Sequence, residues 1–183
     1  MTESDPRDFH LTATLRNGAA VTIRHVRPND RDRLAQAFRK LDRESVYTRF
    51  FRYVTEPTEE QLKRATETDP ARHVALVVTT GTGAGEAIVA SGRYIAAAPT
   101  GGKRTAEVAF VVEEDYQGFG IAGRLLAALA EIGRSQGISG FGAEVLAGNA
   151  SMLRVFARSG IPMKQRREGD VVHIELSLGG EER

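Results

Sequence analysis

The most constraining stretch of the chain is QGFGIAG at residues 117–123, which stands between a strand-like segment and a helix-like one. The apolar run Ala106–Val112 precedes it, and apolar residues then recur at the spacing of one helix face: Ile121, Leu125, Leu129 and Ile132. Backbone N–H groups at such a junction are unpaired and carry the positive end of the helix dipole. Gly118 and Gly120 lack the side chains that would hold a ligand away from these groups. The stretch therefore predicts a pyrophosphate-binding site.

The same letters match the G-x-G-x-x-G fingerprint of dinucleotide-binding proteins, so a nicotinamide-dependent dehydrogenase is one alternative. Glu144 lies 21 residues after Gly123, near the expected place of a ribose-binding acid. The fingerprint should follow its strand directly, however, whereas residues 113–116 intervene here. The 60 residues after Gly123 hold at most one further helix, too few for a doubly wound sheet. The dehydrogenase is therefore the weaker interpretation.

Two other glycine-rich stretches are predicted to be turns. Residues 81–85 (GTGAG) separate two strand-like segments, so they open no helix that could hold an anion. Residues 101–105 (GGKRT) partly match a P-loop, but they lack its upstream glycine and the Ser or Thr directly after Lys103. They also lead into a strand, so we expect a turn here too.

Length and composition narrow the class of protein. The 183 residues suit one domain, which buries roughly 70% of the surface of the unfolded chain. There is no cysteine, which excludes disulfides, thiolate metal sites and cysteine nucleophiles. The 25 Lys and Arg against 24 Asp and Glu argue against a nucleic-acid partner. The N-terminus has no signal-peptide pattern and no apolar run could span a bilayer, so we expect a cytoplasmic protein without membrane contact.

Apolar periodicity predicts an α/β fold in one domain at residues 9–178, between flexible ends at 1–8 and 179–183. Strands are expected at Phe9–Leu15, Ala20–Arg27, Val74–Thr79, Ala87–Ala96, Ala106–Val112, Phe141–Leu146 and Val171–Leu178. Asn17-Gly18 indicates a hairpin between the first two. Helices are expected after Asp30 and Thr58, which can cap them, from Ser45, after residue 120, and at Ser151–Ser159.

Residues 106–138, AEVAFVVEEDYQGFGIAGRLLAALAEIGRSQGI, resemble the acetyl-CoA-binding motif of the GNAT acetyltransferase superfamily. That motif is a strand, a short polar turn, and Gln/Arg-x-x-Gly-x-Gly/Ala opening a helix. Gln117, Gly120 and Ala122 occupy its three key positions. Asn149, before a helix that ends in a glycine turn, also fits the family.

A closer resemblance lies upstream. RKLDRESVYTRFF (39–51), with ARHVALVV (71–78) and AEVAFVV (106–112), is similar to the acetyltransferase domain of bacterial protein lysine acetyltransferases. The likeness extends over roughly residues 19–178 in order and spacing.

The resemblance implies a mixed, mostly antiparallel central sheet with helices on both faces and splayed strands four and five, here Ala106–Val112 and Phe141–Leu146. It implies acetyl-CoA as co-substrate, wedged between those strands, and no metal. The pantetheine arm would lie along the backbone of Phe110, Val111 and Val112 and meet Asn149. The pyrophosphate would lie on the turn and helix start, made of Gln117, Gly118, Phe119, Gly120, Ile121, Ala122 and Gly123. Gly123 is interpreted as a position of close helix packing.

Two catalytic roles follow from the same resemblance. Glu107 is expected to be the general base that takes the proton of the acceptor amine, directly or through water, because AEVAF matches the family's base glutamate. From strand alternation alone, Glu107 would be an ordinary glutamate on a solvent face. The backbone N–H of Val112 is expected to stabilise the oxyanion.

The helix after Asn149 departs from the family pattern. Many members have a tyrosine seven residues after the Asn as general acid, and here that residue is Phe156. We therefore expect no dedicated acid, or water in that role. The leading hypothesis is acetyl transfer to a protein lysine; a small amine or amino acid as acceptor, and a non-catalytic acyl-CoA sensor, stay open. So does a homodimer.

Overall fold

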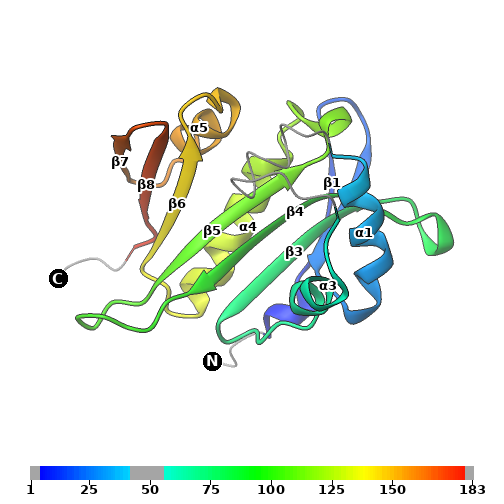
Figure 1. Cartoon of the computed structure of the whole chain (residues 1–183), viewed down its shortest axis with the longest axis horizontal. Helices are drawn as coiled ribbons and strands as arrows, with labels where there is room; N and C mark the ends of the chain where they lie inside the picture. Colours follow the sequence, from blue (N-terminus) through cyan, green and yellow to red (C-terminus); the bar gives the residue numbers. More distant parts are fainter. Residues whose placement is uncertain (1–4, 42–55, 180–183) are drawn as a thin grey trace.

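The expected α/β architecture is confirmed by a computed structural model, which describes residues 5–41 and 56–179 (Figure 1). The described strands form one eight-stranded sheet in the order β1-β2-β3-β4-β5-β6-β8-β7. Their bounds are β1 His10–Thr14, β2 Ala20–His25, β3 His73–Thr80, β4 Ala87–Ala96, β5 Thr105–Val112, β6 Gly140–Leu146, β7 Met163–Glu168 and β8 Val171–Ser177.

The sheet is mixed and mostly antiparallel, as the family resemblance implied. Neighbouring strands pair antiparallel throughout, except β5 and β6, which pair in parallel. A doubly wound, nucleotide-binding sheet would be built from parallel strands. The dehydrogenase interpretation is therefore wrong.

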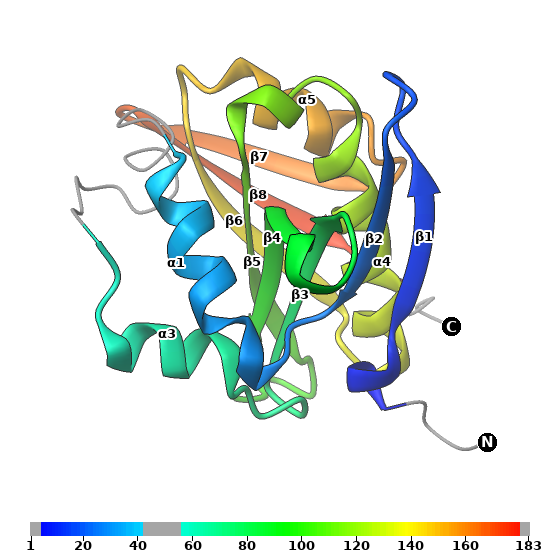
Figure 2. The same cartoon turned by 90° about the vertical axis from the view of Figure 1, so that its right-hand side faces the viewer.

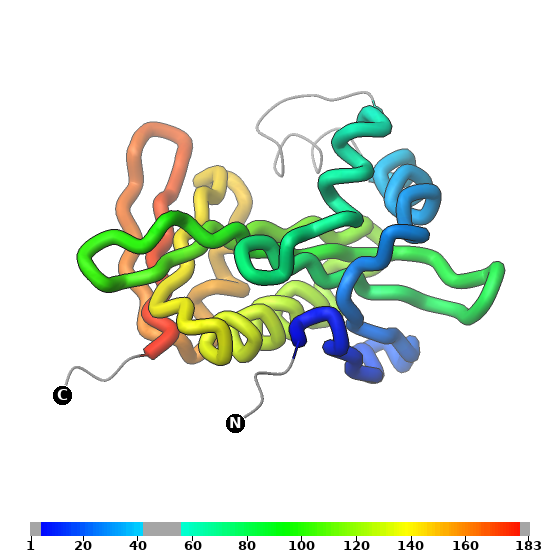
Figure 3. The backbone as a smooth tube through the Cα atoms, turned by 90° about the horizontal axis from the view of Figure 1, so that it is seen from below, coloured from blue at the N-terminus to red at the C-terminus, as the bar shows by residue number. Residues whose placement is uncertain are grey.

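Helices cover both faces of the sheet (Figure 2). α1 (Arg31–Arg39) and α3 (Glu59–Thr66) lie on one face, whereas α4 (Ile121–Ser135) and α5 (Ala150–Ala157) lie on the other. Figure 3 shows the same layers from below, with α4 running along the underside of the sheet. Short 3-10 helices occur at η1 (Pro6–Asp8), η2 (Pro28–Asp30), η3 (Gly83–Gly85) and η4 (Glu114–Tyr116). Within the described residues, no helix is both long and apolar enough to cross a membrane.

The main core lies between the sheet and α4. Alternate residues of the central strands point to that helix, and the members of α4 that meet them are fully buried, as Leu125 and Leu129 show. Gly92 of β4 allows one close contact there, since a Cβ at this position would lie 2.8 Å from the ring of Phe110. A smaller core of Val26, Val77 and Ile88 packs under α1.

Asp30 does not cap α1 with its side chain as we expected. Its carboxylate is fully buried and binds the Arg24 guanidinium at 2.8 Å and the Arg27 N–H at 2.7 Å. Arg24 also pairs with Glu86 at 2.8 Å, which joins β2 to the start of β4. An unpaired buried charge lowers the stability of the fold, so removing either Arg24 or Asp30 would leave the other charge buried without its partner. The Asp30 side chain therefore links the sheet to the start of α1 instead of capping the N-terminus of that helix.

Two further differences concern one strand and the N-terminal end. β7 was not expected, because its residues MKQRRE are almost all exposed and do not alternate. Residues 6–8, expected within a flexible end, form η1, and Pro6 is buried. The helix expected from Ser45 lies outside the described residues.

Candidate active site

β5 and β6 separate after a short parallel contact. They pair at Thr105↔Gly140, Ala106↔Phe141 and Glu107↔Gly142, and beyond Glu107 the two strands diverge toward their C-terminal ends (Figure 1). This is the splayed pair that the resemblance implied. The divergence frees one side of the last five residues of β5 from strand pairing.

The backbone N–H and C=O groups of alternate β5 residues face this gap. Glu113 N–H donates to Val89 O, and Ala97 N–H donates to Thr105 O, each at 2.9 Å. Odd-numbered residues of β5 therefore hydrogen bond with β4, since an antiparallel ladder alternates between its two sides. The backbone groups of Phe110 and Val112 face the gap, whereas those of Val111 face β4 and offer nothing to the gap.

The start of α4 is open at the end of the same strand. Gly118 (φ 83°) and Gly120 (φ 92°) take the left-handed conformation, and no side chain caps the helix. The first turn-to-turn hydrogen bond runs from Arg124 N–H to Gly120 O, so the N–H groups of residues 121–123 have no acceptor within the helix. These donors, with the open space beside Gly118, suit a pyrophosphate.

Gln117 fixes the turn without offering its own amide. Its side-chain Nε2 donates to Val112 O at 3.0 Å, and its backbone N–H donates to Glu114 O at 3.1 Å. The side-chain bond occupies the carbonyl of Val112 and leaves the Val112 N–H facing the gap. Gln117 thus joins the end of β5 to the turn before α4.

The packing interpretation of Gly123 is wrong. A Cβ at Gly123 would meet no atom within 4 Å, and the residue is exposed in the first turn of α4. The close-packing glycine of this helix is Gly133, where a Cβ would lie 3.1 Å from the ring of Phe141. Gly123 instead keeps the face of the open helix start clear.

α5 begins beside the gap with Asn149. The Asn149 side-chain oxygen accepts from Met152 N–H at 3.2 Å, which leaves the two amide hydrogens for another acceptor. Phe156, about two helical turns after Asn149, is 1% exposed and packs against Phe110 with ring centroids 6.0 Å apart. An apolar ring therefore occupies the place of the family's tyrosine.

Glu107 lies where β5 and β6 part, on the face of the sheet opposite α4. Its side chain is exposed, and Arg93 of β4 lies on the same face. Burial lowers the pKa of Arg93, and the negative charge of Glu107 opposes that shift. Burial and the charge of Arg93 lower the pKa of nearby His73 to about 4, so His73 is neutral at pH 7. Glu107 therefore has a cationic neighbour that structure, not sequence spacing, reveals.

Glu107 is far from the Val112 amide. They are five positions apart along the strand, or about 16 Å at the usual rise. A glutamate side chain covers only part of that length. Proton transfer between this carboxylate and an amine held near Val112 would have to pass through water.

Comparison with known families gives one decisive match. The model of the acetyltransferase (GNAT) family matches residues 35–161. The chain belongs to the GNAT acetyltransferase family. This confirms the family that the motif around Gln117, Gly120 and Ala122 predicted.

Individual relatives agree with the GNAT assignment. Acetyltransferase Pat of Mycolicibacterium smegmatis is 34% identical over 151 residues, covering 82% of this chain but only 44% of Pat. The chain thus spans less than half the length of that relative. The GNAT domain of S. lividans PAT is 32% identical, with a TM-score of 0.81, and the match covers 92% of this chain and 96% of that domain. The yncA protein of Salmonella typhimurium, solved with its cofactor acetyl-CoA, shares the fold at 19% identity, with a TM-score of 0.69 and 89% and 96% coverage.

The histidines of β2, β3 and β8 do not gather at this GNAT site. His173 lies 3.4 Å from both Glu144 and Glu168 on the outer strands, and His25 and His73 are at the other end of the sheet. Among residues 5–41 and 56–179, no three His, Cys, Asp or Glu side chains could hold a metal ion.

Arg16 is the residue at the GNAT site that sequence reasoning missed. It sits in the β1–β2 turn, and its Nε and Nη2 atoms each lie 3.8 Å from where a Cβ would stand on Gly120. Asn17-Gly18 predicted the turn, but nothing in the local sequence indicates which element the turn meets.

Proposed function

We propose that the chain transfers an acetyl group from acetyl-CoA directly to the side-chain amine of a protein lysine. The observation that carries this proposal is the β5–β6 gap, lined by the free backbone of β5 and ending at the open start of α4. An extended, hydrogen-bonding arm that ends in a pyrophosphate matches both parts of this site. Membership of the GNAT family supports acetyl-CoA as that ligand.

Each part of the site has one binding task. Phe110 and Val112 offer backbone groups to the pantetheine arm, and the amide hydrogens of Asn149 reach it from α5. The turn and helix start, from Gly118 to Gly123, hold the pyrophosphate. The Val112 N–H then faces the thioester carbonyl and stabilises the negative charge that develops on its oxygen.

The acceptor amine must lose a proton to react. A lysine with a pKa near 10.4 is only about 0.1% neutral at pH 7.4, so a base that takes its proton removes a large handicap. Glu107 is that base, acting through water because of its distance from Val112.

Transfer is direct, with no acyl-enzyme. The amine nitrogen attacks the thioester carbon, the carbon–sulfur bond breaks, and the thiolate of CoA leaves. The chain has no cysteine to carry the acetyl group. Phe156 cannot donate a proton to the thiolate, so water supplies it.

A protein lysine is preferred as acceptor because the relatives include Pat and the GNAT domain of S. lividans PAT. The alternatives are a small amine or amino acid, and a domain that binds acyl-CoA without turning it over. A screen of acetyl-CoA turnover against a lysate proteome and an amine panel separates the three. Acetyl-lysine found by mass spectrometry supports the proposal, whereas turnover with small amines alone contradicts it.

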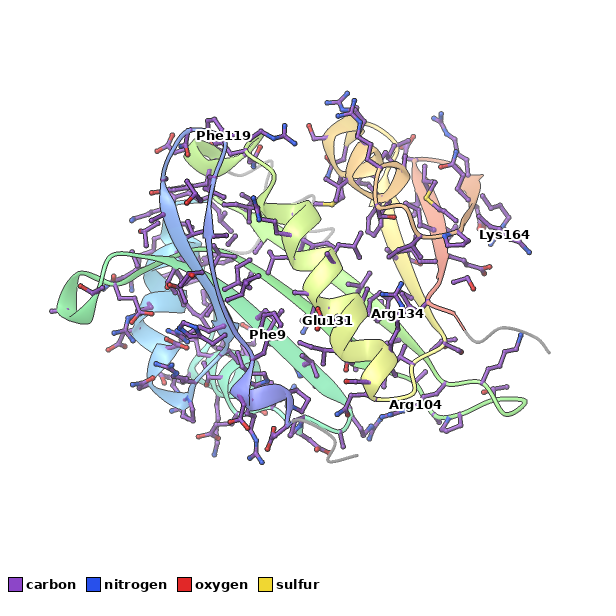
Figure 4. All side chains as sticks on the ribbon, turned by 180° about the vertical axis from the view of Figure 1, so that it is seen from behind. Phe9, Arg104, Phe119, Glu131, Arg134 and Lys164 are labelled. Atoms are coloured by element: carbon purple, nitrogen blue, oxygen red, sulfur yellow. The ribbon has the colours of Figure 1, made fainter. Side chains whose placement is uncertain are left out.

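Glu107→Gln tests the base. We expect kcat to fall about 100-fold while the Kd for acetyl-CoA, measured by calorimetry, changes little. Glu131→Gln is the matched control, because Glu131 is an exposed glutamate on α4 on the other face of the sheet (Figure 4). Unchanged turnover of Glu107→Gln across pH 6–9 would remove Glu107 as base.

A further inference from the structure

The β1–β2 hairpin lies outside the segment matched by the family model, yet its turn reaches the open start of α4. The family match begins at residue 35, whereas the hairpin spans residues 10–25. Figure 4 shows the two strands running along α4, with Phe119 beside their turn. An element outside the family-model segment therefore lies at the open start of α4.

The turn holds Arg16 in a defined place. Leu15 before it is 3% exposed and packs in the main core, and Leu15 N–H donates to Ala19 O at 2.9 Å. Asn17 closes the turn by accepting from Ala19 N–H at 3.1 Å. The residues on both sides of Arg16 are therefore held by packing and hydrogen bonds.

A second contact ties the hairpin to α4. Arg124, in the first turn of the helix, donates from Nη2 to Thr14 O at 3.3 Å. This hydrogen bond joins β1 directly to the first turn of α4, two residues before Arg16. The approach of Arg16 to the helix is part of this docking.

Arg16 presents two donors to the helix start. Its Nε and Nη2 atoms are equally distant, at 3.8 Å, from the Cβ position of Gly120, so this edge of the guanidinium faces the N-cap. Two parallel N–H groups on one edge are the arrangement that binds a phosphate with two hydrogen bonds. An anion held by the N–H groups of residues 121–123 lies within reach of that edge.

The charges around Arg16 leave it available. Among the described residues, no carboxylate lies within ion-pair distance of its guanidinium. Glu113 and Asp115 share a hollow of about 330 Å³ with Asn17, the next residue of the turn, without pairing with Arg16. Arg124 adds a second positive charge at the same helix end. An exposed arginine kept beside unpaired helix amides has an anion as its natural partner.

We propose that Arg16 binds the pyrophosphate of acetyl-CoA, so that the N-terminal hairpin closes over the anion held by α4. The proposal rests on the proposed function, because the ligand is acetyl-CoA. It adds a residue that selects phosphate-bearing thioesters over short ones.

Three ligands separate the phosphates: acetyl-CoA, acetyl-dephospho-CoA, which keeps the pyrophosphate but lacks the 3′-phosphate, and acetyl-pantetheine, which lacks both. We expect Arg16→Gln to raise the Kd of the first two about tenfold and to leave the third unchanged. Calorimetry measures the first two, and an NMR titration measures the weak third ligand. Arg16→Lys keeps the charge but loses the two-donor edge, so its loss should be intermediate.

Two controls separate binding from folding. Arg72→Gln makes the same change at an exposed arginine at the start of β3, the other end of the sheet, and should alter no Kd. The thermal midpoint of the unliganded Arg16→Gln protein should equal that of the wild type. The Kd difference should also shrink as salt rises from about 0.1 to 1 M, since the Debye length falls from about 10 to 3 Å.

The outcomes decide the proposal. Equal losses for all three ligands, a loss confined to acetyl-CoA, or no loss would each overturn the pyrophosphate contact. Wild-type protein that binds no acetyl-CoA would overturn the proposed function and this contact together. Wild-type binding that Arg16→Gln leaves unchanged would remove Arg16 alone.

Discussion

Two helices of this protein begin in opposite ways. α3 is closed by its own side chains: Thr58 Oγ1 accepts from Gln61 N–H at 3.2 Å, and Gln61 Oε1 accepts from Thr58 N–H at 2.8 Å. Glu59 and Glu60 add negative charge to its first turn. α4 begins with a glycine in the left-handed conformation, no side-chain cap and no acid in its first turn.

The difference teaches how to tell a structural helix start from a binding one. A capped start satisfies its N–H groups within the chain, which stabilises the helix. The uncapped start of α4 lacks that stabilisation, and its N–H groups and dipole remain available to the ligand that we propose. Glycines, an arginine with no acid partner among the described residues, and a neighbouring strand gap accompany the second kind here.

The largest effect expected on acetyl-CoA affinity comes from giving α4 the start that α3 has. Gly123 is the third residue of α4, the position that Gln61 holds in α3, and it has open space around it. Gly123→Glu places a carboxylate among the free N–H groups, so we expect the Kd for acetyl-CoA to rise about 30-fold or more. The unliganded protein should gain about 1 kcal/mol of unfolding free energy, because Glu is a better helix former than Gly.

Gly123→Gln is the control for charge. It should keep most of the stability gain, measured by urea unfolding, and lose less affinity than Gly123→Glu. A Gly123→Glu protein that is stabilised yet binds acetyl-CoA like the wild type would show that the ligand does not use these amides.

The next largest effect on acetyl-CoA affinity concerns α5, whose start is capped like that of α3 but also offers free donors like that of α4. Asn149 caps its own helix through oxygen and leaves its amide hydrogens free. Asn149→Asp keeps the capping oxygen and loses the donors, so we expect a Kd for acetyl-CoA about tenfold higher with stability unchanged. Asn149→Ala should also lose about 1 kcal/mol of stability. Equal affinities of wild type and Asn149→Asp would limit Asn149 to its capping role.

Sequence reasoning located the parts of the site that are local in the chain. The turn from Gln117 to Gly123, the helix after it and the strand before it lie next to one another, so their spacing alone indicates the anion site. The cap at Thr58 could be predicted for the same reason. A helix start is defined within about four residues.

Contacts between residues that are far apart in the chain could not be predicted from local sequence. Arg93 meets Glu107 only through the register of β4 and β5, and Arg16 meets Gly120 across more than a hundred residues. Asp30 has the sequence of a cap but is taken up by Arg24 of the neighbouring strand. β7 has no alternation because both of its faces are exposed at the edge of the sheet.

The smallest effect tests the capped side of the comparison. Thr58→Ala removes the oxygen that accepts from Gln61 N–H, so we expect about 1 kcal/mol less unfolding free energy in urea. The Kd for acetyl-CoA should not change, because α3 lies on the opposite face of the sheet from α4. Thr58→Ser keeps a hydroxyl and should retain most of the stability. If Thr58→Ala instead weakened acetyl-CoA binding at unchanged stability, a capped start would also serve the ligand, and the distinction between the two helices would fail.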